Sequence, residues 1–576
     1  MDKNQAADAL EEIAVLLELL GENPFKTRAY VNGARTLRGL EGDLAAVVAA
    51  GGLAELRGFG PALIEKVTEL VTAGRSSYLQ DLRAKVPPGL LDLLRIPGLG
   101  PKRVKEIHDL LGVATLGELE YACHENRLAG LPGFGEKMQA RVLAGIAVVK
   151  KHAERFLLDV ASAEGARLER ALAGLPGVKR ISLAGSLRRR RETVGDLDLV
   201  VATAEPESVM KSFVGWKGVE EVLAHGDTKS SVRLDSGLQV DLRAVTEGQF
   251  PFALLYFTGS KEHNVALRAR AQKRGWKLNE YGLFREDDIL VPCRDEAAVY
   301  KALGLAYVEP ELREDLGEIA AAEEDALPVL LEEKDLRGVL HCHSTYSDGA
   351  NTVREMALAA RELGFAYIGM SDHSQSARYA HGMTPNEVKR QHEEIDRLND
   401  ELEGIRILKG VECDILADGE LDYPDRILAS FDFLIGSIHS RFGLDVRAMT
   451  KRLVTAIHDP HLDVVGHLTG RLLLSREPYA LDVDAVLEAA AKEGVVVEIN
   501  ANPHRLDLDW RACHGFQKRG GMVSINPDAH RTEGLKDVTY GVGIARKGWL
   551  TKDDVLNALP LEKALARFSR RRKGRS

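Results

Sequence analysis

The chain has 576 residues, of which 45% are hydrophobic and 28% charged, with five cysteines and a formal net charge of −10. This length predicts about four domains that bury their own cores. So few cysteines, without framework spacing, exclude a disulfide-stapled secreted domain and favour a reducing compartment. Because neither a leader pattern nor an uncharged apolar run of about 18 residues occurs, we expect a cytoplasmic protein without a membrane span. Residues 1–300 carry as many basic as acidic side chains, so nucleic-acid binding there would need local geometry rather than a basic surface.

The first 150 residues have a helical pattern and repeat one phrase three times. The copies are LRGFGPALIEKV at 56–67, IPGLGPKRVKEI at 96–107 and LPGFGEKMQARV at 131–142. In each, a Gly-x-Gly turn precedes an amphipathic helix whose free N–H groups and positive dipole end can hold a phosphate. One copy would indicate only a helix–helix turn, but three indicate the helix-hairpin-helix signature, which contacts the nucleic-acid backbone without reading sequence. The residues expected to contact DNA are Gly58, Gly60, Gly98, Gly100, Lys102, Gly133, Gly135 and Lys137.

Three aspartates on two predicted strands indicate a phosphoryl-transfer site. In ISLAGSLRRRRETVGDLDLVV (181–201), alternation places Asp196 and Asp198 on one strand face. Asp241 lies on the polar face of the second strand, in LQVDLRAV at 238–245. Like-facing carboxylates repel unless cations lie between them, which is the logic of a two-metal Mg²⁺ site for in-line transfer. An exposed strand edge would also give Asp-x-Asp, but Ser186 and Arg189 just before it are suited to bind phosphate.

These segments, with YFTGSKEHNVALR at 256–268, resemble the palm and fingers of a family X DNA polymerase. The resemblance, which covers roughly residues 1–308, implies that Asp196, Asp198 and Asp241 are catalytic and hold two Mg²⁺ or Mn²⁺ ions, with Asp241 as candidate base. It also implies a set of nucleotide-binding residues. These are Gly185, Ser186 and Arg189 for the phosphates, Tyr256, Phe257 and Gly259 for the sugar, Asn264 for the base edge and Arg268 for the template.

Relatives in this family can carry a 5′-deoxyribose-phosphate lyase that uses a lysine as its Schiff-base nucleophile. Lys66 stands at the matching position, and Lys26 and Tyr30 also match the family pattern. Two further lysines expected around such a site are Ala62 and Tyr78 here. With fewer positive charges nearby, a solvent-facing role for Lys66 on its helix stays open.

From Gly338 onward, apolar strands alternate with helical stretches, and candidate metal ligands follow the strand ends. Twelve of the 17 histidines lie from His341 on. The carboxyl ends of the strands are where a β/α barrel gathers its active site. The candidates are His341, His343, Asp348, His373, Glu412, His439, His467, Asp528 and His530. Nitrogen and carboxylate ligands in this number suit two or three ions such as Zn²⁺ or Mn²⁺, with Glu412 as a bridge. Alternation turns Cys342 and Cys413 away from these ligands, so we expect both to be buried in the core.

HCHSTYSDG, SDHS, GVECD, SIHS, GHL and NPDAH resemble the polymerase-and-histidinol-phosphatase (PHP) domain, over roughly 336–572. The expected fold is multidomain, α plus α/β. It comprises a helical N-terminal domain (1–85), a second helix-hairpin-helix domain (86–155), a nucleotidyltransferase α+β palm (156–246), fingers (247–308), an acidic and helical linker (309–335) and a distorted TIM-like β/α barrel (336–572). The pairing resembles a bacterial or archaeal family X repair polymerase.

The function expected from this combination is filling of short gaps in gapped or nicked DNA with dNTPs, by a monomeric protein associated with the nucleoid. The barrel is expected to act as an Mn²⁺-favoured 3′–5′ exonuclease or 3′-end-processing phosphoesterase. Three alternatives stay open. They are a nucleotidyltransferase acting on RNA ends or small molecules, a DNA-end scaffold with residual chemistry, and a barrel that acts as a small-molecule phosphatase.

Overall fold

The computed structural model describes residues 1–40, 43–56, 58–87, 89–150, 155–285 and 288–573. The chain divides into two compact units, Met1–Val149 and Lys150–Ser576. Among the described residues, no helix is both long and apolar enough to cross a bilayer. All five cysteines are free and buried, including Cys342 and Cys413, which confirms the prediction for these two.

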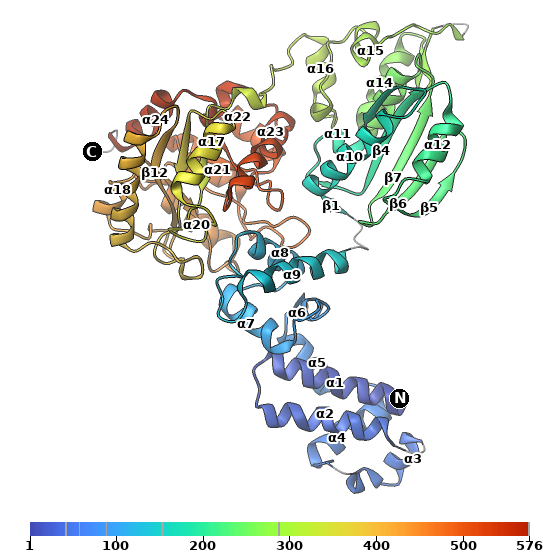
Figure 1. The fold of residues 1–576 in the computed structure, drawn as a ribbon, viewed down its shortest axis with the longest axis vertical. Helices are drawn as coiled ribbons and strands as arrows, with labels where there is room; N and C mark the ends of the chain where they lie inside the picture. Colours follow the sequence, from blue (N-terminus) through green and yellow to red (C-terminus); the bar gives the residue numbers. More distant parts are fainter. Residues whose placement is uncertain (41–42, 57, 88, 151–154, 286–287, 574–576) are drawn as a thin grey trace. The chain divides into compact units, whose positions relative to one another are not determined.

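The first unit is entirely helical (Figure 1). Its elements are α1 (Lys3–Leu19), α2 (Pro24–Arg38), α3 (Leu44–Ala49), η1 (Gly52–Glu55), α4 (Pro61–Ala73), α5 (Ser77–Lys85), α6 (Gly89–Leu93), α7 (Pro101–Leu111), α8 (Leu116–His124) and α9 (Gly135–Lys150). Local chemistry sets several helix starts. Asp2 forms a capping box with Gln5 at α1, and Pro61 and Pro101 occupy first-turn positions where the missing N–H costs nothing.

The second unit begins with a five-stranded mixed sheet in the order β2-β4-β7-β6-β5. Its strands are β2 (Val178–Leu183), β4 (Asp196–Thr203), β5 (Val219–His225), β6 (Lys229–Leu234) and β7 (Gln239–Val245). β4 and β7 are parallel neighbours, whereas the other pairs are antiparallel. Helices α10 (Leu158–Ala173) and α12 (Pro206–Val214), the short α11 (Gly185–Arg188) and a two-stranded ribbon of β1 (Phe156–Leu157) with β3 (Thr193–Val194) complete this part.

A helical subdomain follows, with its own apolar core around Leu267, Val299 and Leu303. Its elements are α13 (Phe250–Thr258), α14 (Lys261–Lys273), β8 (Lys277–Asn279), β9 (Gly282–Phe284), α15 (Glu296–Ala302), η3 (Pro310–Leu312) and α16 (Glu318–Glu323).

The acidic segment at 309–335, which was predicted to be a helical linker, is helical only in part. It contains η3, α16 and η4 (Glu333–Asp335), joined by irregular stretches. Its carboxylates pair with residues distant in the chain: Glu318 accepts from His263 Nδ1 at 2.6 Å, and Glu311 pairs with Arg546 Nε at 2.7 Å. These contacts tie the segment to the rest of the second unit.

The rest of the second unit is a nearly closed barrel of seven parallel strands in sequence order, surrounded by helices (Figure 1). Its strands are β10 (Gly338–Cys342), β11 (Tyr367–Met370), β12 (Arg406–Asp414), β13 (Phe433–Ser437), β14 (Val464–Val465), β15 (Val496–Asn500) and β16 (Val523–Asn526). A parallel bridge between Cys342 and Ala529 joins the first strand to the residues after the last one. The predicted fold class, including the distorted TIM-like barrel, is confirmed.

The helices around the barrel are α17 (Val353–Glu362), α18 (Pro385–Glu401), α19 (Asp425–Leu428), α20 (Val446–Ile457), α21 (Val483–Glu493), α22 (Trp510–Lys518), α23 (Val538–Lys547) and α24 (Leu561–Lys573). Short 3-10 turns lie between them, at η5 (Arg378–Ala380), η6 (Thr532–Asp537), η7 (Lys552–Asp554) and η8 (Leu556–Ala558). Capping boxes at Thr352 and Thr384 fix where α17 and α18 begin. Six of the strands are buried along their whole length, and only Arg406 and Lys409 of β12 depart from this pattern, as expected for parallel strands with both faces covered.

Candidate active sites

The three repeated turns of the first unit agree at their first glycine, but at the second glycine the third turn differs, because Gly135 has a φ of 59° and is the first residue of α9. The first glycine of each, Gly58, Gly98 and Gly133, has a positive φ of 83° to 93°, which a side chain would strain. Gly60 and Gly100 are extended N-caps of α4 and α7. The apolar residue within each Gly-x-Gly is buried, whereas the glycines are exposed, as are Lys102 and Lys137. The free N–H groups at these helix starts therefore face solvent, where a phosphate can reach them.

Lys66 lies in a cluster around one aromatic ring. Its Nζ is 5.0 Å from the ring centroid of Tyr78, and Lys26 Nζ is 5.8 Å from the same centroid. Tyr30 stacks on Tyr78 with centroids 6.3 Å apart. The Lys66 side chain is 16% exposed, so it is only partly open to solvent. Tyr78 therefore occupies the centre of the cluster in which a further lysine was expected.

The polymerase-type carboxylates lie on the two parallel central strands of the mixed sheet. Asp198 of β4 is the register partner of Asp241 of β7. Leu197 and Leu199 are fully buried, so Asp196 and Asp198 share the opposite face, as alternation requires. Burial raises the pKa of Asp198 to about 7, and the neighbouring carboxylates of Asp196 and Asp241 add to this effect. Crowded oxygens of this kind fit divalent cations, which would offset the repulsion.

Gly185 fixes how closely the arginine-rich turn approaches these carboxylates. Its φ is +62°, and a Cβ placed there would lie 2.3 Å from Asp198 Oδ2. Only a glycine allows this approach. Ser186 is half-buried on the same turn.

Arg189 reaches from this turn to the C-terminal end of α13 in the next subdomain. Its Nη1 donates to the Thr258 carbonyl, and a Cβ on Gly259 would lie 3.0 Å from that nitrogen. Its Nε donates to Glu314 Oε1 at 3.1 Å. The structure thus brings together Arg189 and Gly259, two of the residues implied in nucleotide binding.

Three further predicted nucleotide residues line one small pocket. Tyr256, Asn264 and Arg268 lie there with Leu278 and Asn279. Asn264 Nδ2 donates to the Tyr256 carbonyl at 2.7 Å. Beside this pocket, the Phe257 ring packs edge-on against the Tyr256 ring, with centroids 5.2 Å apart. The Arg243 guanidinium lies 5.0 Å from the centroid of the Phe257 ring. These side chains, an aromatic ring, an amide and a guanidinium, are of the kinds that contact the sugar and base of a nucleotide.

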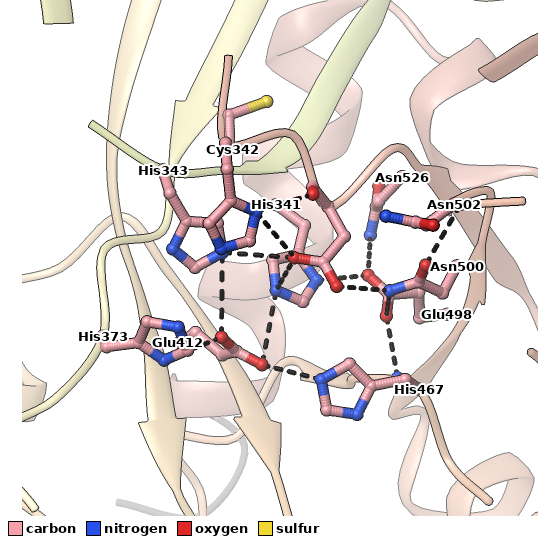
Figure 2. A network of polar contacts seen from close by, with 12 residues as sticks. His341, Cys342, His343, His373, Glu412, His467, Glu498, Asn500, Asn502 and Asn526 are labelled. Carbon is pink, nitrogen blue, oxygen red and sulfur yellow. Dashed lines mark hydrogen bonds and ion pairs between the residues drawn. The ribbon is translucent and has the colours of Figure 1, made fainter. Parts of the chain in front are cut away.

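The nine barrel candidates converge around Glu412, the carboxylate near the end of β12. Figure 2 shows five of them, His341, His343, His373, Glu412 and His467. Its oxygens lie 2.9 Å from His467 Nε2, 3.0 Å from His373 Nδ1 and 3.2 Å from His439 Nε2. They also lie 3.3 Å from His341 Nε2 and 3.7 Å from His343 Nε2. Burial would raise the pKa of Glu412, but the histidines around it hold that pKa well below its usual range. An ionised, buried carboxylate at the centre of five imidazoles is the arrangement expected of a bridging ligand.

Asp348 and Asp528 complete the set from opposite ends of the barrel sequence. Asp348 lies 3.4 Å from His530 Nε2 and 3.5 Å from His373 Nε2. Asp528 lies 3.3 Å from His343 Nε2 and 3.4 Å from His341 Nε2.

Four overlapping groups in the barrel have ligand atoms that all lie within 4.8 Å of one another. They are His343/Asp348/His373/His530, His341/Glu412/His467, His341/His343/Asp528 and His373/Glu412/His439. The three polymerase aspartates do not form such a group. Buried ring nitrogens of His341 and His343 have no hydrogen-bond partner among the described residues. Since buried polar atoms are normally satisfied, their orientation toward shared carboxylates fits divalent cations.

Two carboxylates that the sequence analysis missed hold the ligand histidines from outside. Glu498 lies 2.5 Å from His341 Nδ1 and accepts from the His467 backbone N–H at 2.7 Å. Asp414 lies 2.7 Å from His439 Nδ1. Partners of this kind fix the tautomer and orientation of a ligand imidazole. The signals were present: Glu498 interrupts the apolar strand VVVEIN, and Asp414 follows Glu412 by one alternation period.

Asparagines surround Glu498 and complete this outer layer (Figure 2). Asn526 Nδ2 donates to Glu498 Oε1 at 2.9 Å, and Asn500 Nδ2 donates to Asp528 Oδ2 at 3.0 Å. The Cys342 sulfur points away from the histidines, so no thiolate joins this cluster (Figure 2).

Three of the nine candidates have left-handed backbone. The φ angles are 57° at His341, 22° at His467 and 53° at Asp528. His341 also lies where the β10–β11 register shifts between Val339 and Cys342. Such conformations cost free energy in residues other than glycine and concentrate at functional sites.

Comparison with known proteins agrees with this geometry. Models of a helix-hairpin-helix domain and of a SAM-like helix-hairpin-helix tandem match residues 1–76 and 90–147. The DNA polymerase beta thumb model matches 253–314, and the PHP domain model matches 340–502. The chain is 41% identical over 565 residues to the DNA polymerase/3′-5′ exonuclease PolX of Bacillus subtilis, which covers 98% of both chains. The chain belongs to this PolX family.

Two relatives match only one part each of this PolX-family chain. The Repair DNA polymerase X of African swine fever virus (isolate Pig/Kenya/KEN-50/1950) is 32% identical over 145 residues, or 23% of this chain and 82% of the viral protein. A probable phosphatase of Thermoanaerobacter sp. (strain X514) is 28% identical over 229 residues, or 38% of this chain and 88% of the phosphatase. Membership of the PolX family also implies DNA binding and the use of divalent metal ions.

Proposed function

We propose that this chain is a family X repair polymerase that fills short gaps in gapped or nicked DNA, with a 3′–5′ exonuclease in its barrel. The observation that carries the proposal is the match to PolX over almost the whole of both chains. It is supported by two separate sets of metal-ligand residues within one compact unit.

In the polymerase half, Asp196, Asp198 and Asp241 would hold two Mg²⁺ or Mn²⁺ ions. Bound there, the ions would lower the pKa of the attacking 3′-hydroxyl and neutralise the departing pyrophosphate. Ser186 and Arg189 would hold the triphosphate of the dNTP. Arg189 is suited to this because its guanidinium already lies beside Gly259, at the C-terminal end of α13 in the nucleotide-binding subdomain.

The nucleotide-selection residues would act from α13 and α14. Tyr256 and Phe257 would pack against the sugar, Asn264 would contact the base edge, and Arg268 would contact the template strand. Asn264 and Arg268 are four residues apart on α14, so they share one helix face.

In the barrel, the nine ligands centred on Glu412 would hold two or three Zn²⁺ or Mn²⁺ ions, which activate water for phosphoester hydrolysis. Asp414 and Glu498 would orient His439 and His341. Carboxyl ends of seven strands converge here, so a DNA 3′ end must enter from this face of the barrel.

The first unit would hold the DNA through its exposed helix-hairpin-helix turns without reading sequence. We propose a monomeric, cytoplasmic and nucleoid-associated protein.

The test uses one 5′-labelled primer on gapped duplex DNA, with Mg²⁺ or Mn²⁺ and with or without dNTPs. We expect Asp198→Ala to abolish extension only and His341→Ala to abolish shortening only. Failure of the wild-type protein to extend with any dNTP would contradict the polymerase assignment. Extension without any shortening would contradict the exonuclease assignment.

A second candidate for the barrel is a phosphatase of small phosphorylated molecules, favoured by its likeness to the probable phosphatase of Thermoanaerobacter sp.. The two assignments differ in the bond cleaved. The barrel of a nuclease prefers a DNA phosphodiester, whereas a metabolite phosphatase prefers a free phosphomonoester. Comparing kcat/KM for both substrates in the same preparation, with His341→Ala as the blank, decides between them.

A second candidate for the first unit is a deoxyribose-phosphate lyase with Lys66 as the nucleophile, favoured by the clustering of Lys66 and Lys26 around Tyr78. Borohydride should then trap a covalent adduct with 5′-deoxyribose-phosphate DNA in the wild-type protein. The adduct should be lost in Lys66→Ala and kept in Lys85→Ala. An adduct that survives Lys66→Ala would contradict this assignment.

A further inference from the structure

A lysine of the barrel half is buried against the polymerase half of the same compact unit. Lys547, the last residue of α23, is 1% exposed. Its Nζ donates to the main-chain carbonyl of Arg189 at 3.1 Å and to the carboxylate of Glu314. The same ammonium lies 4.7 Å from the Trp510 ring centroid. The barrel thus contributes a charge directly beneath the arginine-rich turn.

Other residues of the turn also contact the barrel, so the Lys547 contact is not isolated. Arg190 packs on α23 so closely that a Cβ at Gly543 would lie 3.3 Å from its side-chain carbons. Glu192, at the end of the turn, lies 3.7 Å from Arg471 Nη2.

Glu314 links Lys547 to Arg189. Its carboxylate accepts from Arg189 Nε at 3.1 Å and lies 3.6 Å from Arg191 Nη1. Burial would raise the pKa of Glu314, but Lys547 and Arg189 hold it below its usual range. Burial in turn lowers the pKa of the Lys547 amine to about 8, against the pull of Glu314. Glu314 is therefore an ionised, largely buried carboxylate that hydrogen-bonds to both Lys547 and Arg189, with Arg191 farther away.

This sharing creates a competition for Arg189. A triphosphate bound at the turn must draw the Arg189 guanidinium away from Glu314. A buried carboxylate left without a cation is strongly destabilising, so Glu314 would resist that transfer if Arg189 were its main partner. With Lys547 in place, Glu314 keeps a close cation after Arg189 turns to the nucleotide.

We propose that Lys547 is a positioning residue for nucleotide binding in the polymerase half, acting on the Arg189 side chain through Glu314. The proposal rests on the proposed role of Arg189 as a ligand of the triphosphate. By this mechanism the barrel supports the polymerase site electrostatically, independently of its own metal-dependent chemistry.

The test measures KM for dNTP and kcat on gapped DNA in the full-length protein, with exonuclease activity measured in parallel. Lys547→Met keeps the contact with Trp510 but removes the charge. We expect KM to rise about tenfold, as for a typical coupling between sites, with kcat and exonuclease activity unchanged. Adding Glu314→Gln to Lys547→Met should return KM toward the wild-type value, because the competing carboxylate is gone. A double-mutant cycle with Arg189→Ala should show that Lys547→Met has no effect without the arginine.

Three results would overturn the proposal. The first is an unchanged KM in Lys547→Met with normal exonuclease activity. The second is a raised KM that Glu314→Gln does not reverse. The third is a parallel loss of both activities with a lower melting temperature, which would make Lys547 a purely structural residue.

The single variants Glu314→Gln and Arg189→Ala distinguish failure of this inference from failure of the proposed role of Arg189. If Lys547→Met does not fold, Glu314→Gln alone decides, because competition predicts an equal or lower KM and a higher KM contradicts it. If Arg189→Ala leaves KM unchanged, the proposed role of Arg189 fails and this inference fails with it. If Arg189→Ala raises KM but Lys547→Met does not, only the inference fails.

Discussion

The two candidate metal sites differ in how they are assembled and in how deeply they lie. The polymerase aspartates come from two adjacent strands, and they are exposed or half-buried. The barrel ligands come from the ends of strands spread from β10 to β16, and all but the half-buried His439 are buried. The first set has only oxygen donors, whereas the second is rich in imidazole. The contrast indicates exchangeable ions that arrive with the nucleotide in one site and ions retained as part of the fold in the other.

The largest expected effect is on the centre of the barrel site. Glu412→Gln keeps the shape of the bridging residue but removes the charge that five histidines face. We expect exonuclease activity to fall by about a thousandfold, in line with the cost of removing one partner of a buried charge set. Polymerase activity should not change. The matched control is Glu420→Gln, an exposed residue that follows the same strand. Retained exonuclease activity in Glu412→Gln would contradict the bridging role.

A substitution in the polymerase half is expected to have a smaller effect on activity. Gly185→Ala places a Cβ 2.3 Å from Asp198 Oδ2 on a backbone with φ of +62°, so the turn and the carboxylate must separate. We expect extension to fall about a hundredfold through misplacement of groups near the chemistry, with the exonuclease unaffected. Gly174→Ala is the matched control, because its Cβ meets nothing closer than 3.8 Å. Equal extension by the two variants would rule out this packing argument.

Removal of metal ions should distinguish the two sites through its effect on the stability of the second unit rather than on activity. If the free concentration of the metal ion is about a thousand times its Kd for the barrel, each bound ion adds about 4 kcal/mol to the free energy of unfolding. Stripping them with a chelator should lower the melting temperature of the second unit by about 10 °C, and Mn²⁺ should restore it. Adding Mg²⁺ to Mn²⁺-loaded protein should shift the melting temperature little. An unchanged melting temperature after stripping would indicate that the barrel ions are not part of the fold.

The smallest expected effect is a pH dependence of folding stability that arises where the barrel half contacts the polymerase half. Burial raises the pKa of Asp537, just before α23, to about 7, with Asp159 of α10 adding to the shift. The folded state therefore holds a proton up to about pH 7, whereas the unfolded state releases it near the ordinary aspartate pKa of 3.8. Stability from this group is complete below the unfolded pKa and is lost as pH rises through the folded one.

Asp537→Asn should therefore stabilise the protein at pH 8 and have little effect at pH 4. With an allowance for partial exposure, the gain at pH 8 is on the order of 1 kcal/mol. Melting curves of Asp537→Asn at both pH values check this, with the exposed Asp553→Asn as the control. An equal shift at both pH values would contradict the assignment to this titration.

Much of the architecture could be predicted from the sequence because local rules govern it. Alternation placed Leu197 and Leu199 in the core and left Asp196 and Asp198 on the opposite face, and burial agrees. The repeated Gly-x-Gly phrases gave the turns with positive φ at Gly58, Gly98 and Gly133. The barrel could be predicted because polar residues at successive strand ends must meet at one face of a parallel sheet.

Only the tertiary structure decided which charges meet across long sequence distances. Composition predicted a helical linker at 309–335 but not that Glu314 and Glu318 pair with Lys547 and His263. The partner of Glu498, His341, lies 157 residues away in the sequence, so no local pattern indicates that contact. A carboxylate in a sequence looks the same whether water or a distant cation will surround it. Its role is set by burial, because an ionised group leaves water only where the fold supplies an opposite charge.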